Sequence, residues 1–178
     1  RLRIPAAGSP AEVAWRADDV VLLCMKTQDT AAALVELERW AGCRVPVVCA
    51  QNGVENERLA ARRFADVYAM LVALPAVHLE PGVVVASGAP LSGCLHAGRY
   101  PRGTDPLIRA VCAALDGAGF RSEAVDDALA LKYRKLLLNL GNGLDVILGT
   151  SSWGAGGEVG EFLALLRAEG EACYQAAG

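Results

Sequence analysis

The sequence is short of the residues that build metal centres. Among its 178 residues there are only two histidines, and the six cysteines include no Cys-x-x-Cys pair. A structural zinc site needs closely spaced cysteine or histidine ligands, so no metal site is expected. Cys24, Cys49 and Cys112 lie inside apolar runs, where a thiol behaves as a small hydrophobic side chain. We therefore expect reduced core cysteines in a cytoplasmic protein.

Long apolar runs and basic stretches are missing as well. No uninterrupted apolar segment approaches the ~20 residues of a membrane-spanning helix, and Arg1–Pro10 lacks the apolar core of a signal peptide. The net charge is −3, and basic residues occur only in short clusters such as Arg62-Arg63 and Arg134-Lys135. Neither a membrane nor a nucleic acid is therefore expected as a partner.

What the first part of the sequence does contain is an alternation of apolar runs and helical patterns. The predicted strands cover 19–25, 45–49 and 67–74, and the predicted helices between them cover 30–40, capped by Asp29 or Thr30, and 55–64. This alternation is typical of parallel strands joined by right-handed crossovers. We expect an α/β, Rossmann-like domain with a mostly parallel sheet over residues 1–125.

The pattern changes after Pro81. The short runs 83–86 and 93–96, separated by Gly and Pro, predict a hairpin of edge strands. Further predicted elements are a helix at 105–117, a candidate final strand at 120–124, one long helix at 126–148, a Gly/Ser loop at 149–157 and a helix at 158–177. A domain boundary near Asp126 follows, with an all-helical domain over 126–178.

A glycine-rich phosphate loop is absent, since no Gly-x-Gly-x-x-Gly follows a strand. The predicted strands nevertheless correspond to the later half of a dinucleotide-binding fold, whose first half carries that loop. Arg1 is also not a natural first residue. We therefore expect the N-terminal strand–helix–strand unit of the fold to lie outside this sequence.

Polar residues follow two of the predicted strands. Lys26 comes directly after 19–25, and Gln51-Asn52-Gly53 follows 45–49. Ligands of open parallel sheets bind at the carboxyl ends of strands, where a lysine can meet a phosphate and an amide can bond a ribose hydroxyl. Each feature also has an ordinary interpretation, a solvated lysine that ends a strand and a simple Asn-Gly turn.

Three polar residues recur on one face of the predicted helix 126–148. Lys135 and Asn139 are four residues apart, and Asn142, seven from Lys135, falls on nearly the same face. This polar stripe faces either a cleft or the solvent, and the cleft is favoured because leucines occupy the other faces too. A lysine in a cleft suits a general acid toward a carbonyl oxygen.

In their order and spacing these motifs resemble the ketopantoate reductase family. The family's strand and lysine correspond to 21–26, its Gln-Asn-Gly motif to 51–53, its next strand and hairpin to 67–98, and its Lys-Leu-x-x-Asn signature to 135–139. The resemblance implies a Rossmann-like NADP-binding domain and a helical domain similar to that of 6-phosphogluconate dehydrogenase. It also implies that family segments before Arg1 and beyond Gly178 are not included.

The resemblance further implies a reaction, the NADPH-dependent reduction of 2-dehydropantoate (ketopantoate) to pantoate in pantothenate and coenzyme A biosynthesis. Lys135 matches the catalytic lysine, which protonates the ketone oxygen and holds the substrate, and Asn139 matches an asparagine that orients the substrate. The positions that match contacts to NADP are Lys26, Asn52 and Ala76. The expected partners are a small 2-oxo acid and, through the helical domain, a second copy in a homodimer.

The sequence departs from the family pattern at Gly143, where many relatives carry a second asparagine. Asn142 lies one residue early, about 100° away on a helix, and contacts substrate only if the helix is locally distorted. No further polar substrate contact is recognisable in 150–153, and the family's late serine and glutamate lie beyond Gly178. The alternatives are a reductase of another small 2-oxo acid and a non-catalytic relative used for dimerisation or ligand sensing.

Overall fold

The computed structural model describes residues 3–152 and 154–177, and the chain divides into two compact units. Unit 1 is Arg1–Lys132 and contains a sheet flanked by helices; the described part of unit 2, Tyr133–Gly178, consists of helices joined by a short turn and a loop. The helix α4 (Ala128–Asn139) begins in unit 1 and continues into unit 2. The expected functional domains, 1–125 and 126–178, stay a prediction.

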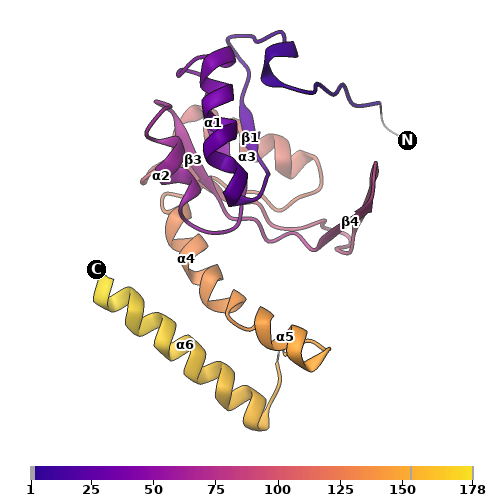
Figure 1. Ribbon diagram of the computed structural model, residues 1–178, viewed down its shortest axis with the longest axis vertical. Coiled ribbons are helices and arrows are strands. Elements are labelled where there is room, and N and C mark those ends of the chain that lie inside the picture. Colours follow the sequence, from indigo (N-terminus) through magenta and orange to yellow (C-terminus); the bar gives the residue numbers. More distant parts are fainter. Residues whose placement is uncertain (1–2, 153, 178) are drawn as a thin grey trace. The chain divides into compact units, whose positions relative to one another are not determined.

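A four-stranded sheet forms the centre of unit 1 (Figure 1). Its order is β1 (Val21–Leu23), β2 (Val47–Cys49), β3 (Val67–Met70) and β6 (Ala97–Arg99). The first three strands are parallel, and β6 runs antiparallel to β3. Every residue of β2 and β3 is buried, as expected for strands covered on both faces. The predicted Rossmann-like α/β fold is confirmed.

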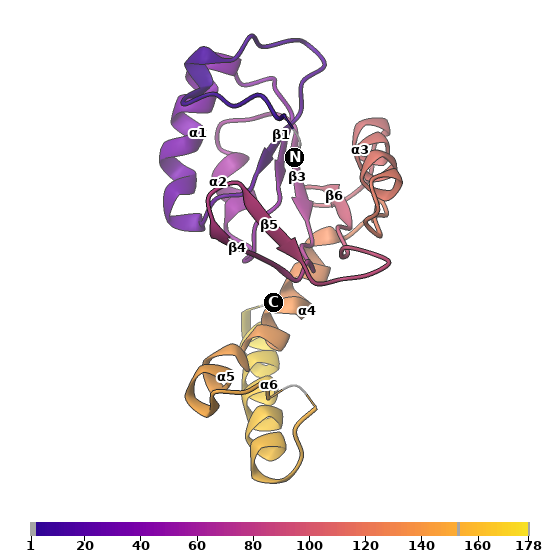
Figure 2. The same cartoon turned by 90° about the vertical axis from the view of Figure 1, so that its right-hand side faces the viewer.

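Helices cover both faces of this sheet (Figure 2). The helices α1 (Thr27–Ala41) and α2 (Asn56–Ala60) lie on one face, and α3 (Pro106–Gly117) lies on the other. Leu34 and Leu37 of α1 belong to one buried apolar cluster with β2, and Ile108 of α3 belongs to the other. A short 3-10 helix, Pro10–Glu12, precedes β1 within the lead-in to the sheet. The two apolar clusters on opposite faces explain why the central strands are continuous apolar runs.

A polar network joins α3 to the sheet. The Asp105 carboxylate caps α3 by accepting from the Ile108 N–H at 2.9 Å, and it accepts from the Tyr68 hydroxyl at 2.7 Å. The Arg99 guanidinium donates to Asp105 at 2.7 Å and to Asp66 at 2.6 Å. Burial by itself raises the pKa of Asp105, but these donors outweigh it and hold that pKa below its ordinary value. β3, β6 and the start of α3 are thereby linked by charged hydrogen bonds.

The predicted hairpin has a different first strand. β5 (Val83–Ala86) pairs antiparallel with β4 (Ala76–Glu80), and not with 93–96 as expected. Gly82, at a φ of +77°, makes the tight turn between them, a conformation that glycine adopts without the strain of a Cβ atom. Two strands on either side of a two-residue turn pair more readily than strands separated by a longer loop.

The expected strands at 93–96 and 120–124 were wrong as regular strands. Cys94 makes isolated bridges to Ala73 and Arg121, and Ala97 makes one to Ala124. Both segments therefore run beside the sheet without forming a continuous ladder.

Cysteine burial agrees with expectation at two of three positions. Cys49 and Cys112 are buried, and burial raises the pKa of the Cys49 thiol to about 12. Cys24 is exposed, contrary to the prediction of a core thiol. It follows β1, which lies at the edge of the sheet, so alternate side chains there, Leu22 and Cys24, point away from the core.

The helical pattern 126–148 is two helices rather than one. α4 ends at Asn139, and α5 (Asn142–Leu148) begins after Leu140-Gly141. Gly141 is buried, and a Cβ atom there would lie 3.1 Å from Leu163 of α6 (Gly157–Ala177) and 3.3 Å from the Ser152 hydroxyl. Packing of these distant residues against Gly141 cannot be read from the helical periodicity, which predicted one helix.

Unit 2 is held together by contacts between its helices. The Tyr133 and Tyr174 rings meet edge to face with centroids 5.3 Å apart, and the Tyr174 hydroxyl donates to the Tyr133 carbonyl at 3.2 Å. The Ser152 N–H donates to Asp145 at 2.6 Å, which ties the expected loop back to α5. Trp153 lies outside the described residues.

Candidate functional site

Lys26 and Asn52 occupy equivalent positions after neighbouring parallel strands. Leu23 ends β1 and is paired in register with Cys49, which ends β2; Lys26 and Asn52 each follow three residues later. Both side chains are exposed. Lys26 is also the N-cap residue of α1, whose first N–H groups favour a negative group. The structure thus brings two sequence-predicted residues together at the carboxyl edge, where ligands of such sheets bind.

A buried hydrogen-bond network ties the two loops to each other. The Gln51 amide donates to the Met25 carbonyl at 2.7 Å and to the Thr30 hydroxyl at 2.9 Å. The Thr30 hydroxyl lies 3.0 Å from Asn56 Oδ1, and the Asn56 amide donates to the Asn52 carbonyl at 3.2 Å. Because the side chains of this network are buried, it fixes both loops against α1 and α2.

Thr30 has a different role from the one expected. The sequence suggested Asp29 or Thr30 as the cap of this helix, but α1 already begins at Thr27 and Thr30 is buried within it. In the sequence, Thr30 is 21 residues from Gln51 and 26 residues from Asn56. A threonine one turn into a helix and a glutamine after a strand give no local signal that they will meet.

The backbone after Asn52 is open to a bound group. Gly53 has a φ of +83°, and no atom lies within 4 Å of the position of a Cβ atom there. An exposed lysine, an exposed amide and an accessible glycine backbone are the donor types that hold phosphate and ribose oxygens. These residues therefore fit the polar part of a dinucleotide.

A buried ion pair lies close to this network and was not foreseen. Lys132 of α4 binds Glu57 of α2 through Nζ and Oε1, and the two residues are only 4% and 0% exposed. Burial raises the pKa of the Glu57 carboxyl, and the positive charge of Lys132 opposes that rise. The other Glu57 oxygen, Oε2, has no hydrogen-bond partner among the described residues. The partners are 75 residues apart, so spacing could not have revealed them.

The candidate substrate residues Lys135 and Asn139 both lie in the part of α4 that belongs to unit 2. Both are half-buried, and four residues of helix place them on the same face, as the periodicity predicted. Asn139 lines a largely apolar cavity of about 340 Å³ together with Leu136, Leu137, Leu140, Gly170, Cys173 and Tyr174.

Asn142 lies beyond the end of α4, on the next helix. It is exposed at the start of α5 and lines a separate cavity of about 40 Å³ with Asp145, Ser152 and Arg167 among its neighbours. Leu140-Gly141 separates α4 from α5, so the helical periodicity that relates Lys135 to Asn139 is interrupted before Asn142. A substrate contact of Asn142 was expected only with a local distortion of the helix; the break at Leu140-Gly141 is such a distortion, and the contact stays a prediction.

Ala76 is the first residue of β4 and is exposed. It pairs with Ala86 in the two-stranded sheet, a different sheet from the one that contains β1 and β2. Its assignment as a cofactor contact stays a prediction of the family resemblance.

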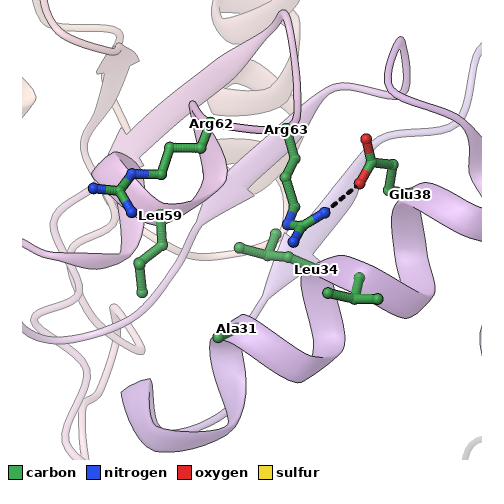
Figure 3. A pocket seen from close by; sticks show the side chains of 7 residues that line it. Ala31, Leu34, Glu38, Leu59, Arg62 and Arg63 are labelled. Atoms are coloured by element: carbon green, nitrogen blue, oxygen red, sulfur yellow. Dashed lines mark hydrogen bonds and ion pairs between the residues drawn. The ribbon is translucent and has the colours of Figure 1, made fainter.

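A further cavity of about 410 Å³ lies between α1 and the end of α2 (Figure 3). Arg63 and Glu38 form an ion pair at 2.6 Å on its rim, above the side chains of Ala31, Leu34 and Leu59. None of its lining residues is among the candidate site residues that the sequence suggested. Within 3–152 and 154–177, no group of three His, Cys, Asp or Glu side chains could hold a metal ion. No helix among these residues has the length and apolarity to span a membrane.

Comparison with known proteins gives consistent matches. The family model described as ketopantoate reductase PanE/ApbA matches residues 5–101. A 2-dehydropantoate 2-reductase from Halobacterium salinarum is 31% identical over 125 residues, which are 69% of this chain and 40% of that protein. The crystal structure of a PanE/ApbA family ketopantoate reductase from Ralstonia eutropha JMP134 is 26% identical with a TM-score of 0.74, covering 90% of this chain and 52% of that one.

A D-mandelate dehydrogenase in complex with NADH shares the fold at 20% identity and a TM-score of 0.73, covering 85% of this chain and 52% of that one. This chain therefore spans about half the length of the relatives that it matches.

Proposed function

Because the chain belongs to the PanE/ApbA ketopantoate reductase family, we propose that it forms part of an enzyme that reduces 2-dehydropantoate to pantoate with NADPH. The observation that carries the proposal is the equivalent placement of Lys26 and Asn52, each three residues beyond the end of adjacent parallel strands. Those positions support a dinucleotide site, and the buried network behind them holds the two loops in place. The biosynthetic pathway, the cytoplasmic location and a homodimer stay predictions of the resemblance.

Lys26 and Asn52 act as binding residues in this proposal. The Lys26 ammonium group, at the N-cap of α1, neutralises a phosphate or bonds a ribose hydroxyl. The Asn52 amide bonds a ribose hydroxyl or the nicotinamide carboxamide, and the Ala76 backbone lies along the cofactor. When bound, NADPH supplies the hydride that is added to the carbonyl carbon.

Lys135 is the proposed general acid. Its Nζ donates a proton to the ketone oxygen while negative charge develops there, so hydride and proton together convert the ketone to an alcohol. Asn139, four residues later on α4, orients the 2-oxo acid through its side-chain amide. Asn142 adds a further polar contact only if the substrate also reaches α5.

A second candidate is a reductase of another small 2-oxo acid. Gly143 stands where many ketopantoate reductases carry an asparagine, and Asn142 is exposed at the start of α5, beyond the helix break. Loss of the polar contact at position 143 alters the recognition of a substrate hydroxyl more than it alters the acid chemistry at Lys135. Both candidates are nicotinamide-dependent reductases, and for the second candidate NADH and NADPH are both to be tested as the cofactor.

The test is a substrate and cofactor panel with the complete protein that contains this chain. Oxidation of NADPH and of NADH is followed with 2-dehydropantoate, pyruvate and phenylglyoxylate as the carbonyl substrates. The proposal expects kcat/KM to be highest for NADPH with 2-dehydropantoate. Preference for another 2-oxo acid would establish the second candidate, and nucleotide binding without any turnover would favour a non-catalytic relative.

A further inference from the structure

The buried Glu57–Lys132 pair is a poor source of stability. Removing two charges from water is expensive, and their mutual attraction compensates only when every polar atom finds a partner. Here one carboxylate oxygen of Glu57 is buried without a hydrogen-bond partner among the described residues. An apolar pair of similar volume in such a place is often as stable as the ion pair. We therefore expect the pair to affect the placement of the helices it joins more than the stability of the fold.

The pair is one of two anchors on the first turns of α4. Ala128, at the helix start, is 1% exposed, and its Cβ atom lies 3.3 Å from the position that a Cβ atom on Gly98 would occupy. Lys132 follows four residues later on the same face and is held by Glu57. Two anchors one turn apart fix both the position of a helix and its rotation about its own axis.

Lys135 lies three residues beyond Lys132 on the same continuous helix. Three residues turn a helix by about 300° and advance it by about 4.5 Å, so the two side chains leave the helix about 60° apart. A rotation of α4 at Lys132 is therefore passed on to the direction of the Lys135 side chain. Glu57 in turn follows Asn56, whose amide bonds the carbonyl of Asn52.

We propose that the Glu57–Lys132 ion pair is a positioning device that fixes the rotation of α4 and, through it, the direction of the Lys135 side chain. The pair ties the first turns of α4 to α2, and Lys135 follows on the same continuous helix. This proposal rests on the proposed function, in which Lys135 acts as the general acid. Glu57 and Lys132 themselves do not touch the substrate.

The experiment uses the complete protein and two variants of the pair. Glu57→Leu/Lys132→Met replaces it by apolar side chains of similar size, and Glu57→Asp keeps both charges but withdraws the carboxylate by one methylene. The matched control is Glu38→Leu/Arg63→Met, which removes an ion pair whose side chains are 37% and 41% exposed and which lies outside α4. The urea midpoint, the Kd for NADPH, kcat with the preferred 2-oxo acid and amide exchange at residues 133–139 are measured for each protein.

A positioning role predicts a fall in kcat of tenfold or more, roughly the effect of a misplaced catalytic group, in both pair variants. The Kd for NADPH and the urea midpoint of the double variant stay close to wild type, and the control variant Glu38→Leu/Arg63→Met keeps the wild-type kcat. Amide exchange at 133–139 becomes faster, while exchange in β2 and β3 does not change.

Wild-type kcat and wild-type exchange in the pair variants would overturn the proposal. Should the double variant fail to fold, Glu57→Asp decides by the same criteria, because a purely structural pair that stays charge-balanced leaves kcat unchanged. Should the wild-type protein reduce no 2-oxo acid, the proposed function fails. Amide exchange then decides alone whether the pair fixes α4, and unchanged exchange overturns the positioning role.

Discussion

Replacing Thr30 by valine tests the network that fixes the loops after β1 and β2. The side chain of Thr30 is fully buried, and valine has nearly the same shape without the hydroxyl. The substitution removes the group that lies 3.0 Å from Asn56 Oδ1 and the acceptor for the Gln51 amide at 2.9 Å. Two polar groups then remain buried with one partner fewer.

The expected magnitude follows from those two groups. A buried polar group left without its partner costs about 1–3 kcal/mol, and the Gln51 amide keeps its bond to the Met25 carbonyl. We expect Thr30→Val to lower the free energy of unfolding by about 2–4 kcal/mol. Since the same network holds the Asn52 carbonyl through Asn56, the Kd for NADPH should also rise.

Urea denaturation followed by far-UV circular dichroism measures the first effect. Thr104→Val is the matched control, because the Thr104 hydroxyl accepts a bond from Arg109 at an exposed position and its loss should change stability by less than about 0.5 kcal/mol. A double-mutant cycle of Thr30→Val with Asn56→Ala should be clearly non-additive. If Thr30→Val were as stable as the control, the network would contribute nothing measurable and this reasoning would be refuted.

Three further predictions concern unit 1. The pKa of Asp105 is lowered in the folded protein, so its stabilising contribution is complete above the unfolded pKa of about 3.9 and is lost as pH falls through the lower folded pKa. Asp105→Asn should therefore flatten the loss of stability below pH 5 in acid titrations followed by circular dichroism. An unchanged slope of stability against pH would contradict this. In thermal melts, Gly98→Ala should be strongly destabilising, because the new Cβ atom collides with the Val125 carbonyl. Gly117→Ala meets no atom within 4 Å and should be stabilising by up to about 1 kcal/mol. Equal melting temperatures of the two variants would show that the strand that contains Gly98 can shift. Ile108 is fully buried in the apolar cluster between α3 and the sheet, so Ile108→Ala should lower the free energy of unfolding by about 2–5 kcal/mol in urea titrations. A loss below about 1 kcal/mol would mean that this cluster collapses to fill the cavity.

The fold was predictable where one physical signal dominates. Continuous apolar runs and helical periodicity located β1, β2, β3, α1 and α3, because strands covered on both faces need apolar residues at every position. The equivalent places of Lys26 and Asn52 followed from the same reasoning, since parallel strands end at one edge. The β4–β5 hairpin was missed because 83–86 was expected to pair with 93–96, whereas the short turn at Gly82 favours pairing with β4.

The parts that escaped prediction depend on contacts between distant residues. Leu163 of α6 and the Ser152 hydroxyl pack against Gly141, at the break between α4 and α5, and nothing in the leucine spacing indicates that contact. The sequence around Lys132 offers several basic residues, and which one is buried depends on Glu57, 75 residues earlier. The buried Thr30–Gln51–Asn56 network is of the same kind.

The central claim, that Lys135 is the acid in a nicotinamide-dependent ketone reduction, is tested most directly by one comparison. Turnover of NADPH with 2-dehydropantoate is measured for the complete wild-type protein, for Lys135→Ala and for Arg134→Ala, an exposed neighbour on the same helix. The account predicts that Lys135→Ala loses about 10²–10⁴-fold in kcat, the usual contribution of a general acid, while it still binds NADPH. Arg134→Ala should turn over like wild type, and an active Lys135→Ala variant with wild-type kcat would contradict the account.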